Sequence, residues 1–195
     1  VIVPGDISWG MNLSEALTDL RFIDTLPGKK LLGKGNHDFW WTTVSKMKAF
    51  LAENGITTID FLYNNAYAFE DCIVAGTRGW FQEKSMQKTV GEVDYEKIVN
   101  REAQRLKMSL DAAVQLRPKA GKDLPILAFL HFPPVLGDIV SRELVDMLRA
   151  YGVKTCYFGH IHGIYDLPPV QTFDGIRFHL ISADYLNFMP QLVRI

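Results

Sequence analysis

The stretch "CYFGHIHG", residues 156–163, places two histidines one residue apart and brackets them with glycines. It continues from "KTCYF", a short run of apolar and β-branched residues of the kind that forms buried strands. The whole chain contains only five histidines, so a pair at the end of a strand calls for an explanation. The pair could be a packed or hydrogen-bonded loop, or it could be half of a metal site.

Three other apolar stretches end in the same way. "VIVP" leads into Asp6, "KKLLGK" leads into "GNHD" at 35–38, and "PILAFL" leads into His131. Ligands in open α/β sheets bind outside the carboxyl ends of the strands, so these loops are expected to gather in one crevice. The residues that qualify as metal ligands are Asp6, Asn36, His131, His160 and His162. Oxygen and nitrogen donors without sulfur suit a divalent ion such as Mn, Fe or Zn.

Each loop also has an ordinary explanation when it is taken alone. Asp6 could occupy a turn because aspartate favours turns, and "GNHD" could be a hydrogen-bonded loop for the same reason. His131 could be a buried histidine beneath the turn at 133–134. The occurrence of all four loops at strand ends in one chain favours a shared metal site over four separate accidents.

Helical and strand-like patterns alternate along the chain. Amphipathic spacing predicts four helices, and shorter apolar runs predict nine strands, with the pairs at 57–69 and 170–182 joined by the turns "NN" and "DG". The predicted helices are 13–26, 40–54, 93–116 and 141–152, the third ended by Pro118. The predicted strands are 1–3, 29–35, 57–63, 66–69, 71–77, 125–130, 154–158, 170–173 and 176–182. This order indicates a mixed α/β layered fold in one domain, residues 1–195.

The bulk composition excludes several classes of protein. A formal net charge of −1 gives no electrostatic basis for a dedicated nucleic-acid or anionic-membrane binder. The apolar runs are far shorter than the ~20 residues of a membrane span. Cys72 and Cys156 lie inside apolar segments, which favours buried, reduced thiols and a cytoplasmic location.

The ordered set of "GD" at 5–6, "GNHD" at 35–38, His131 and "GHIH" at 159–162 resembles the calcineurin-like metallophosphoesterases. The stretches "GDISWGMNL", "KGNHDFWW" and "GTRGW" are similar to a bacterial group of predicted phosphohydrolases in that superfamily. The resemblance implies a four-layer αββα sandwich of two mixed sheets with metals at the strand ends. It also implies hydrolysis of phosphomonoesters or phosphodiesters by a metal-activated water at a dinuclear centre.

The resemblance further assigns roles to the candidate ligands. Asp6 would bridge two divalent ions, of which Mn is favoured. The coordination of the second ion would be completed by Asn36, His131 and His160. Asn36 would also contact the phosphate. His162 would bind the first ion.

Four positions outside this ligand set carry further expectations. His37 would lie near the leaving group and donate a proton or stabilise charge. Trp9 stands where protein phosphatases of the superfamily carry an Asp-Arg pair, whose Asp is the usual partner of the catalytic histidine. Asp38 is the candidate that could replace it as the partner of His37. Arg78 is a candidate phosphate contact or a structural ion pair. The tryptophans near the motif loops either form a stacking wall for a substrate ring or pack in the core: Trp9, Trp40, Trp41 and Trp80.

The ligand count is uneven between the two ions. The first ion has only Asp6 and His162, and two protein ligands hold an ion poorly. In the family an upstream Asp-x-His motif supplies the others, and no Asp-x-His occurs in this sequence. We therefore expect that an N-terminal strand with two ligands is missing, that this chain holds one ion, and that it has little activity alone.

The sequence also leaves a second class of function open. A catalytically weak binding scaffold with the same fold is the alternative, although the intact His37 favours an enzyme. We expect the partner to be a small phosphoester, with neither a membrane nor nucleic acid as partner. Which phosphoester it is, and the oligomeric state, are not determined by these residues.

Overall fold

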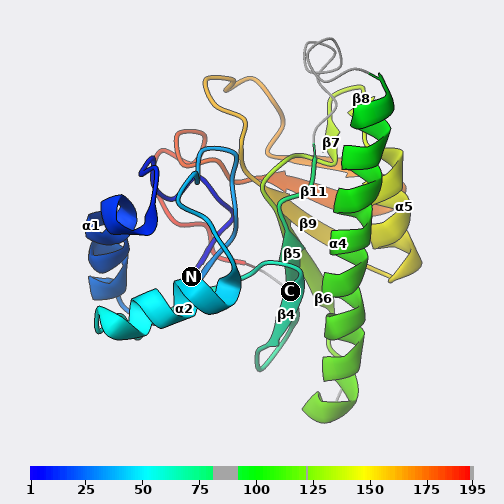
Figure 1. Ribbon diagram of the computed structural model, residues 1–195. Helices are drawn as coiled ribbons and strands as arrows, with labels where there is room; N and C mark the ends of the chain where they lie inside the picture. The colour runs from blue at the N-terminus through cyan, green and yellow to red at the C-terminus, as the bar shows by residue number, and fades with distance from the viewer. Residues whose placement is uncertain (81–91, 122, 194–195) are drawn as a thin grey trace.

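A computed structural model describes residues 1–80, 92–121 and 123–193 of the chain. The N-terminal part forms a three-stranded parallel sheet in the order β1-β2-β3, with strands at Ile2–Val3, Lys30–Leu32 and Ile59–Phe61. Helices α1 (Leu13–Thr25) and α2 (Val44–Glu53) connect these strands and cover the outer face of the sheet (Figure 1).

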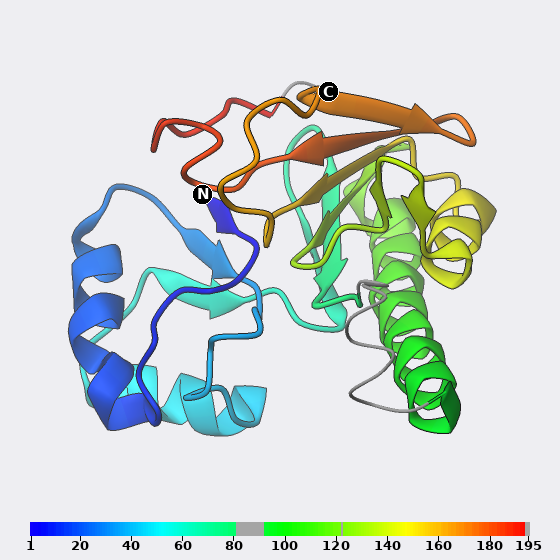
Figure 2. The same ribbon diagram turned by 90° about the horizontal axis from the view of Figure 1, so that it is seen from above.

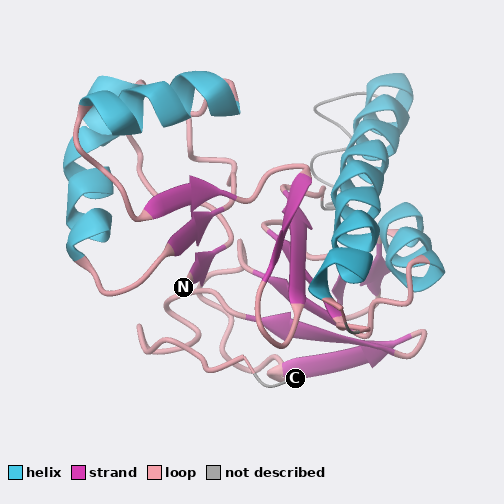
Figure 3. Ribbon diagram, turned by 90° about the horizontal axis from the view of Figure 1, so that it is seen from below, coloured by secondary structure: helices cyan, strands magenta, loops and turns pink. Residues whose placement is uncertain are grey.

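The rest of the described chain builds a six-stranded mixed sheet in the order β10-β11-β9-β6-β5-β4. The three central pairings are parallel, and the outermost strand on each side is antiparallel to its neighbour. The strands are β4 (Asn65–Ala68), β5 (Ile73–Thr77), β6 (Ile126–Leu130), β9 (Thr155–Phe158), β10 (Val170–Phe173) and β11 (Ile176–Leu180). Helices α4 (Glu92–Ala120) and α5 (Arg142–Ala150) lie on its outer face, and a small hairpin joins β7 (Val135–Leu136) to β8 (Ile139–Val140) (Figure 3).

The two sheets pack face to face between the two helical layers (Figure 2). Neighbouring side chains of a strand point to opposite faces, so a strand buried on both faces reads as a continuous apolar run. In β6, Leu127 and Phe129 face the smaller sheet, where Leu31 of β2 belongs to the same buried cluster. Ile126, Ala128 and Leu130 instead pack towards α4 and α5. A third cluster lies between the smaller sheet and its two helices.

These layers confirm the predicted αββα sandwich. The six-stranded sheet is mixed as expected, whereas the described strands of the smaller sheet are all parallel. The predicted turn at Asp174-Gly175 is confirmed, because both residues have positive φ (47° and 74°) and connect β10 to β11. The prediction of two buried thiols is confirmed as well.

Two predictions of local structure are wrong. The strands around 57–63 and 66–69 do not form a hairpin, because β3 pairs with β2 and β4 pairs with β5 of the other sheet. Asn64, with φ of 61°, turns the chain out of one sheet and into the next. The long helix also does not stop before Pro118 but runs on to Ala120. A proline this close to the helix end disturbs only the last turn.

Of the helices that the structure describes, none combines the length and the apolar character needed to cross a lipid bilayer.

Ser109 on α4 connects this helix by hydrogen bonds to the edge of the six-stranded sheet. Its fully buried hydroxyl accepts a hydrogen bond from the backbone N–H of Gly76 (2.7 Å) and donates one to the carbonyl of Asn65 (2.6 Å). We expect Ser109→Ala to lower the free energy of unfolding by about 1–3 kcal/mol, because the Gly76 N–H would be left buried without this acceptor. Urea unfolding followed by circular dichroism measures the loss. The exposed control Ser45→Ala should change stability by less than about 0.5 kcal/mol, and equal effects would contradict this role.

Candidate metal centre

The candidate ligands lie where the carboxyl ends of the two sheets meet. Asp6 and the loop at 35–38 follow β1 and β2 of the smaller sheet. His131 and the loop at 160–162 follow β6 and β9 of the larger sheet. A contact of 3.2 Å between His131 Nδ1 and the carbonyl of Pro4 crosses from one sheet to the other. The four strand ends therefore meet as expected, with two from each sheet, and their junction is called the crevice.

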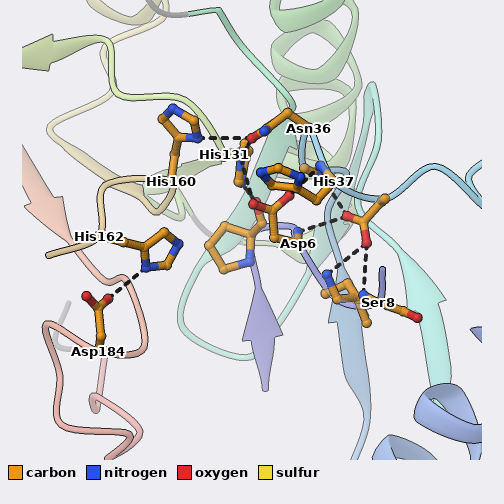
Figure 4. Close-up of polar contacts among 12 residues, drawn as sticks. Asp6, Ser8, Asn36, His37, His131, His160, His162 and Asp184 are labelled. Carbon is orange, nitrogen blue, oxygen red and sulfur yellow. Dashed lines mark hydrogen bonds and ion pairs between the residues drawn. The ribbon is translucent and has the colours of Figure 1, made fainter. Parts of the chain in front are cut away.

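Four of the five predicted ligands converge in this crevice (Figure 4). One donor atom each from Asp6, His131 and His160 lies within 4.8 Å of the others. The side-chain oxygen of Asn36 is 2.7 Å from His131 Nε2 and 3.0 Å from His160 Nδ1. His131 Nε2 is also 3.6 Å from the Asp6 carboxylate.

The side chains around His131 Nε2 are better arranged to bind a cation than to form hydrogen bonds with one another. His131 is 2% exposed, and burial lowers its pKa to about 4 despite the opposing charge of Asp6. A neutral ring carries one proton, and the contact of Nδ1 with the Pro4 carbonyl favours the tautomer with that proton on Nδ1. Nε2 then presents a lone pair to the oxygens of Asn36 and Asp6. Unprotonated acceptors that face one another are the arrangement a divalent cation requires.

Two glycines let the backbone come close enough to build this cluster. Gly5 has φ of 119°, and a Cβ there would lie 2.5 Å from the backbone nitrogen of Gly35 and 2.7 Å from His131 Nδ1. A Cβ on Gly35 would lie 1.9 Å from the Asp6 carboxylate. Asp6 and His160 themselves have positive φ, 56° and 67°, which non-glycine residues seldom adopt. Strained backbone of this kind gathers at functional sites.

Asp38 holds the two loops of the smaller sheet together. Its carboxylate is 2% exposed and accepts hydrogen bonds from the indole of Trp40 and from four backbone N–H groups. Those four belong to Asp6, Ile7, Ser8 and Gly35, at 2.8–3.2 Å. Burial raises the pKa of Asp38, and the backbone N–H groups oppose that rise.

The hydrogen bonds of Asp38 show a structural role that the sequence analysis did not predict. Its described hydrogen bonds go to Trp40 and to the backbone, and none goes to the His37 ring. Both carboxylate oxygens are occupied, since Oδ1 takes three of the five hydrogen bonds and Oδ2 takes two. Asp38 therefore shapes the loops, and its role as the partner of His37 stays a prediction.

His37 lies beside the cluster and is framed by aromatic rings. Its backbone N–H donates to the Asp6 carboxylate at 2.9 Å, which ties the residue to the proposed ligand. Its ring stacks on Trp9, with 4.2 Å between centroids and 6° between planes, and meets the edge of Phe39 at 6.1 Å. Trp40 and Trp41 are buried, and Trp80 packs on Phe132, so of the four tryptophans Trp9 alone is exposed.

His162 lies outside the cluster, next to an acid that the sequence analysis did not name as a candidate, Asp184. Its ring nitrogen lies 2.8 Å from the carboxylate of Asp184, which also accepts from the backbone N–H of Gly163 at 2.9 Å. Burial would raise the pKa of Asp184, but these hydrogen bonds outweigh it and lower the value to about 2. Asp184 follows β11, which is parallel to β9, so strand order could have placed it near His162.

Arg78, at the end of β5, lies near the crevice within an ion-pair cluster. Its guanidinium is 3.8 Å from the fully buried Glu102 and lies over the rings of Trp80 and Phe132. Arg105 contacts the same carboxylate at 2.6 Å. The Arg78 carbonyl accepts from the N–H of His131. These contacts are those of a structural ion pair, and a phosphate contact by Arg78 stays a prediction.

The geometry defines a class of protein: an αββα sandwich with nitrogen and oxygen donors that could hold a metal ion where its two sheets meet. A model of the calcineurin-like phosphoesterase family matches residues 1–163. The chain belongs to this family, as the motif resemblance predicted.

Comparison with solved structures agrees at the level of the fold. Six chains match, and one crystal structure aligns with a TM-score of 0.51 at 13% identity. The alignment covers 85% of this chain but 62% of that one, so this chain spans less than two thirds of the matched structure. No curated protein matches the sequence.

We expect removal of the Asp38 carboxylate to damage the fold and the metal centre together. Asp38→Ala would leave four backbone N–H groups without their acceptor, at about 1–3 kcal/mol for each that stays buried and unpaired. Urea unfolding should therefore show a loss of at least ~3 kcal/mol, and Mn²⁺ binding should weaken because Asp6 loses its support. Asp166→Ala, in an exposed loop, is the matched control. If Asp38 were instead the partner of His37, Asp38→Asn would lower turnover and leave stability and metal binding intact.

Proposed function

We propose that this protein hydrolyses small phosphoesters at a divalent metal centre formed by Asp6, Asn36, His131 and His160. The observation that carries the proposal is the convergence of oxygen and nitrogen donors around His131 Nε2. Membership of the calcineurin-like phosphoesterase family supports the same reaction. Of the ions that fit this donor set, Mn is favoured, with Fe and Zn as alternatives.

Bound divalent ions supply Lewis acidity and lower the pKa of a coordinated water. The protein's own part is to hold the donors rigidly. The Pro4 carbonyl fixes the His131 ring, and the Asp38 carboxylate fixes the loops that carry Asp6 and Asn36. Asn36 would also orient the phosphate. Donors held in advance need no reorganisation when charge develops on the phosphate oxygens.

His37 is proposed as the catalytic group at the leaving group. Its backbone N–H donates to the Asp6 carboxylate, its ring stacks on Trp9, and the residue lies beside the converging donors (Figure 4). A ring in this position can give a proton to the departing oxygen or stabilise its negative charge.

His162 is proposed as a ligand to a second ion that Asp6 would share. The observation in favour is that its ring lies on the crevice side of the loop after β9, next to the carboxylate of Asp184. Asp184 would orient that ring, as acids hydrogen-bonded to histidine ligands generally do. The two-ion arrangement and the cytoplasmic location are parts of this proposal.

Metal binding tests the proposed ligands directly. We expect the 195-residue chain to retain about one Mn²⁺ after dialysis, and His131→Ala to lose it. His179→Ala is the matched control, because that histidine lies on β11, stacks on Tyr157 and belongs to neither loop. Inductively coupled plasma mass spectrometry gives the stoichiometry, and circular dichroism verifies folding. Folded wild-type protein that retains no metal would refute the assignment.

The proposed role of His37 makes a separate prediction about turnover. His37→Ala should reduce kcat on p-nitrophenyl phosphate by about 10²–10⁴-fold, the usual contribution of a general acid or base. Metal content should stay the same, since the residue's link to Asp6 runs through its backbone N–H. A variant that loses its metal would instead make His37 a ligand. Unchanged kcat would remove it from the chemistry.

A further inference from the structure

An exposed tryptophan lies directly beside the proposed reaction centre. Trp9 is 70% exposed, although one face of its indole is covered by the ring of His37 at 4.2 Å. With that face stacked and most of the residue still accessible, the opposite face of the indole is open to solvent. Large aromatic side chains usually bury most of their surface, so an exposed one at a reaction centre requires a reason.

The loop that carries Trp9 is held in place on both sides. The N–H groups of Ile7 and Ser8 donate to Asp38, and the Ser8 hydroxyl donates to Asp19 at 2.5 Å. Gly10, which follows Trp9 in the sequence, donates its backbone N–H to the Ser8 hydroxyl. Trp9 is thus presented to solvent by a fixed backbone, which reduces the entropy lost when a ligand stacks on it.

The surroundings of Trp9 form a small apolar rim next to the metal centre. The ring of Phe39, 52% exposed, meets the His37 ring edge-on, with 6.1 Å between the ring centroids. Met11, two residues beyond Trp9, is exposed as well. The backbone N–H of His37 donates to the Asp6 carboxylate, so these apolar side chains adjoin the proposed metal centre. A ligand that spans this arrangement would need a phosphate at one end and a flat apolar ring at the other.

We propose that the open face of Trp9 is a subsite for a planar ring in the leaving group of the substrate, such as the base of a nucleoside monophosphate. The proposal rests on the proposed function, because it places the phosphate of the same molecule at the metal centre. The ring stacks on the open face of Trp9, and the other face of the indole is covered by His37, the residue proposed at the leaving group. The net charge of −1 favours a small molecule over a polynucleotide.

Binding of non-hydrolysable ligands tests the subsite without relying on turnover. The ligands are the methylenephosphonate analogues of adenosine 5′-monophosphate and ribose 5-phosphate, together with benzylphosphonate and free adenosine. Isothermal titration calorimetry with Mn²⁺ should show the adenosine phosphonate binding about tenfold or more tightly than the ribose phosphonate, the usual effect of stacking one base. Tighter binding of benzylphosphonate than of the ribose phosphonate would extend the ligand class to aryl esters. Tighter binding of the adenosine phosphonate only would restrict the class to nucleotides.

Variants at Trp9 then test whether the tighter binding of the adenosine phosphonate depends on this residue. Trp9→Ala should abolish the preference for the adenosine phosphonate while leaving the affinity for the ribose phosphonate unchanged, and Trp9→Phe should retain part of it. Phe22→Ala is the matched control, because Phe22 is similarly exposed (66%) but lies on α1. Phe22→Ala should change the affinity for neither phosphonate.

Two results would overturn the proposal. Equal affinity of the wild type for both phosphonates would show that no ring is recognised. An equal loss of affinity for both in Trp9→Ala would show that Trp9 only supports His37 and the phosphate site.

Failure of the proposed function looks different from failure of the subsite. If no phosphonate binds but free adenosine does, and Trp9→Ala abolishes that binding, the subsite stands and the phosphoesterase proposal fails. If ribose 5-phosphate is hydrolysed and adenosine adds no affinity, the phosphoesterase proposal stands and the subsite fails.

Discussion

The hydrogen bonds accepted by the buried carboxylate of Asp38 are the constraint on which the site depends. They connect the loop after β1 to the loop after β2 through the N–H groups of Asp6 and Gly35. A buried carboxylate is tolerated only when it is well satisfied, and this one has five donors. Asp38 therefore determines the geometry of the loop that carries Asp6 and Trp9.

The second constraint is the contact between the sheets. His131 belongs to the larger sheet, yet its ring is oriented by the Pro4 carbonyl of the smaller one. Gly5 and Gly35 leave the space that this approach needs. The donor set therefore exists only while the sheets stay packed, and the buried cluster around Leu31, Leu127 and Phe129 keeps them so. Stability of the sandwich and affinity for the ion are linked for this reason.

Much of the centre was predictable because its ligands follow recognisable strands. The motifs "GNHD" and "GHIH" identify Asn36 and His160 from residue type and position alone, and the order of elements indicates the layered fold. The pairing of 57–63 with 66–69 was predicted wrongly, because the sequence between them is typical of a turn whether the chain returns to the same sheet or enters another. The contact of Asp184 with His162 was missed, because it depends on β11 lying beside β9.

The sequence by itself determined the family, the layered α/β fold and the residue types that can hold a metal, because strand patterns and motif spacing are local properties of the chain. Only the tertiary structure decided what Asp38 and Trp9 do. Neighbours in the sequence did not distinguish a carboxylate that faces His37 from one that faces backbone N–H groups, nor an indole in the core from one in solvent. Those outcomes depend on which groups the packing of the two sheets brings within hydrogen-bonding or stacking distance, and these contacts join residues up to 127 positions apart.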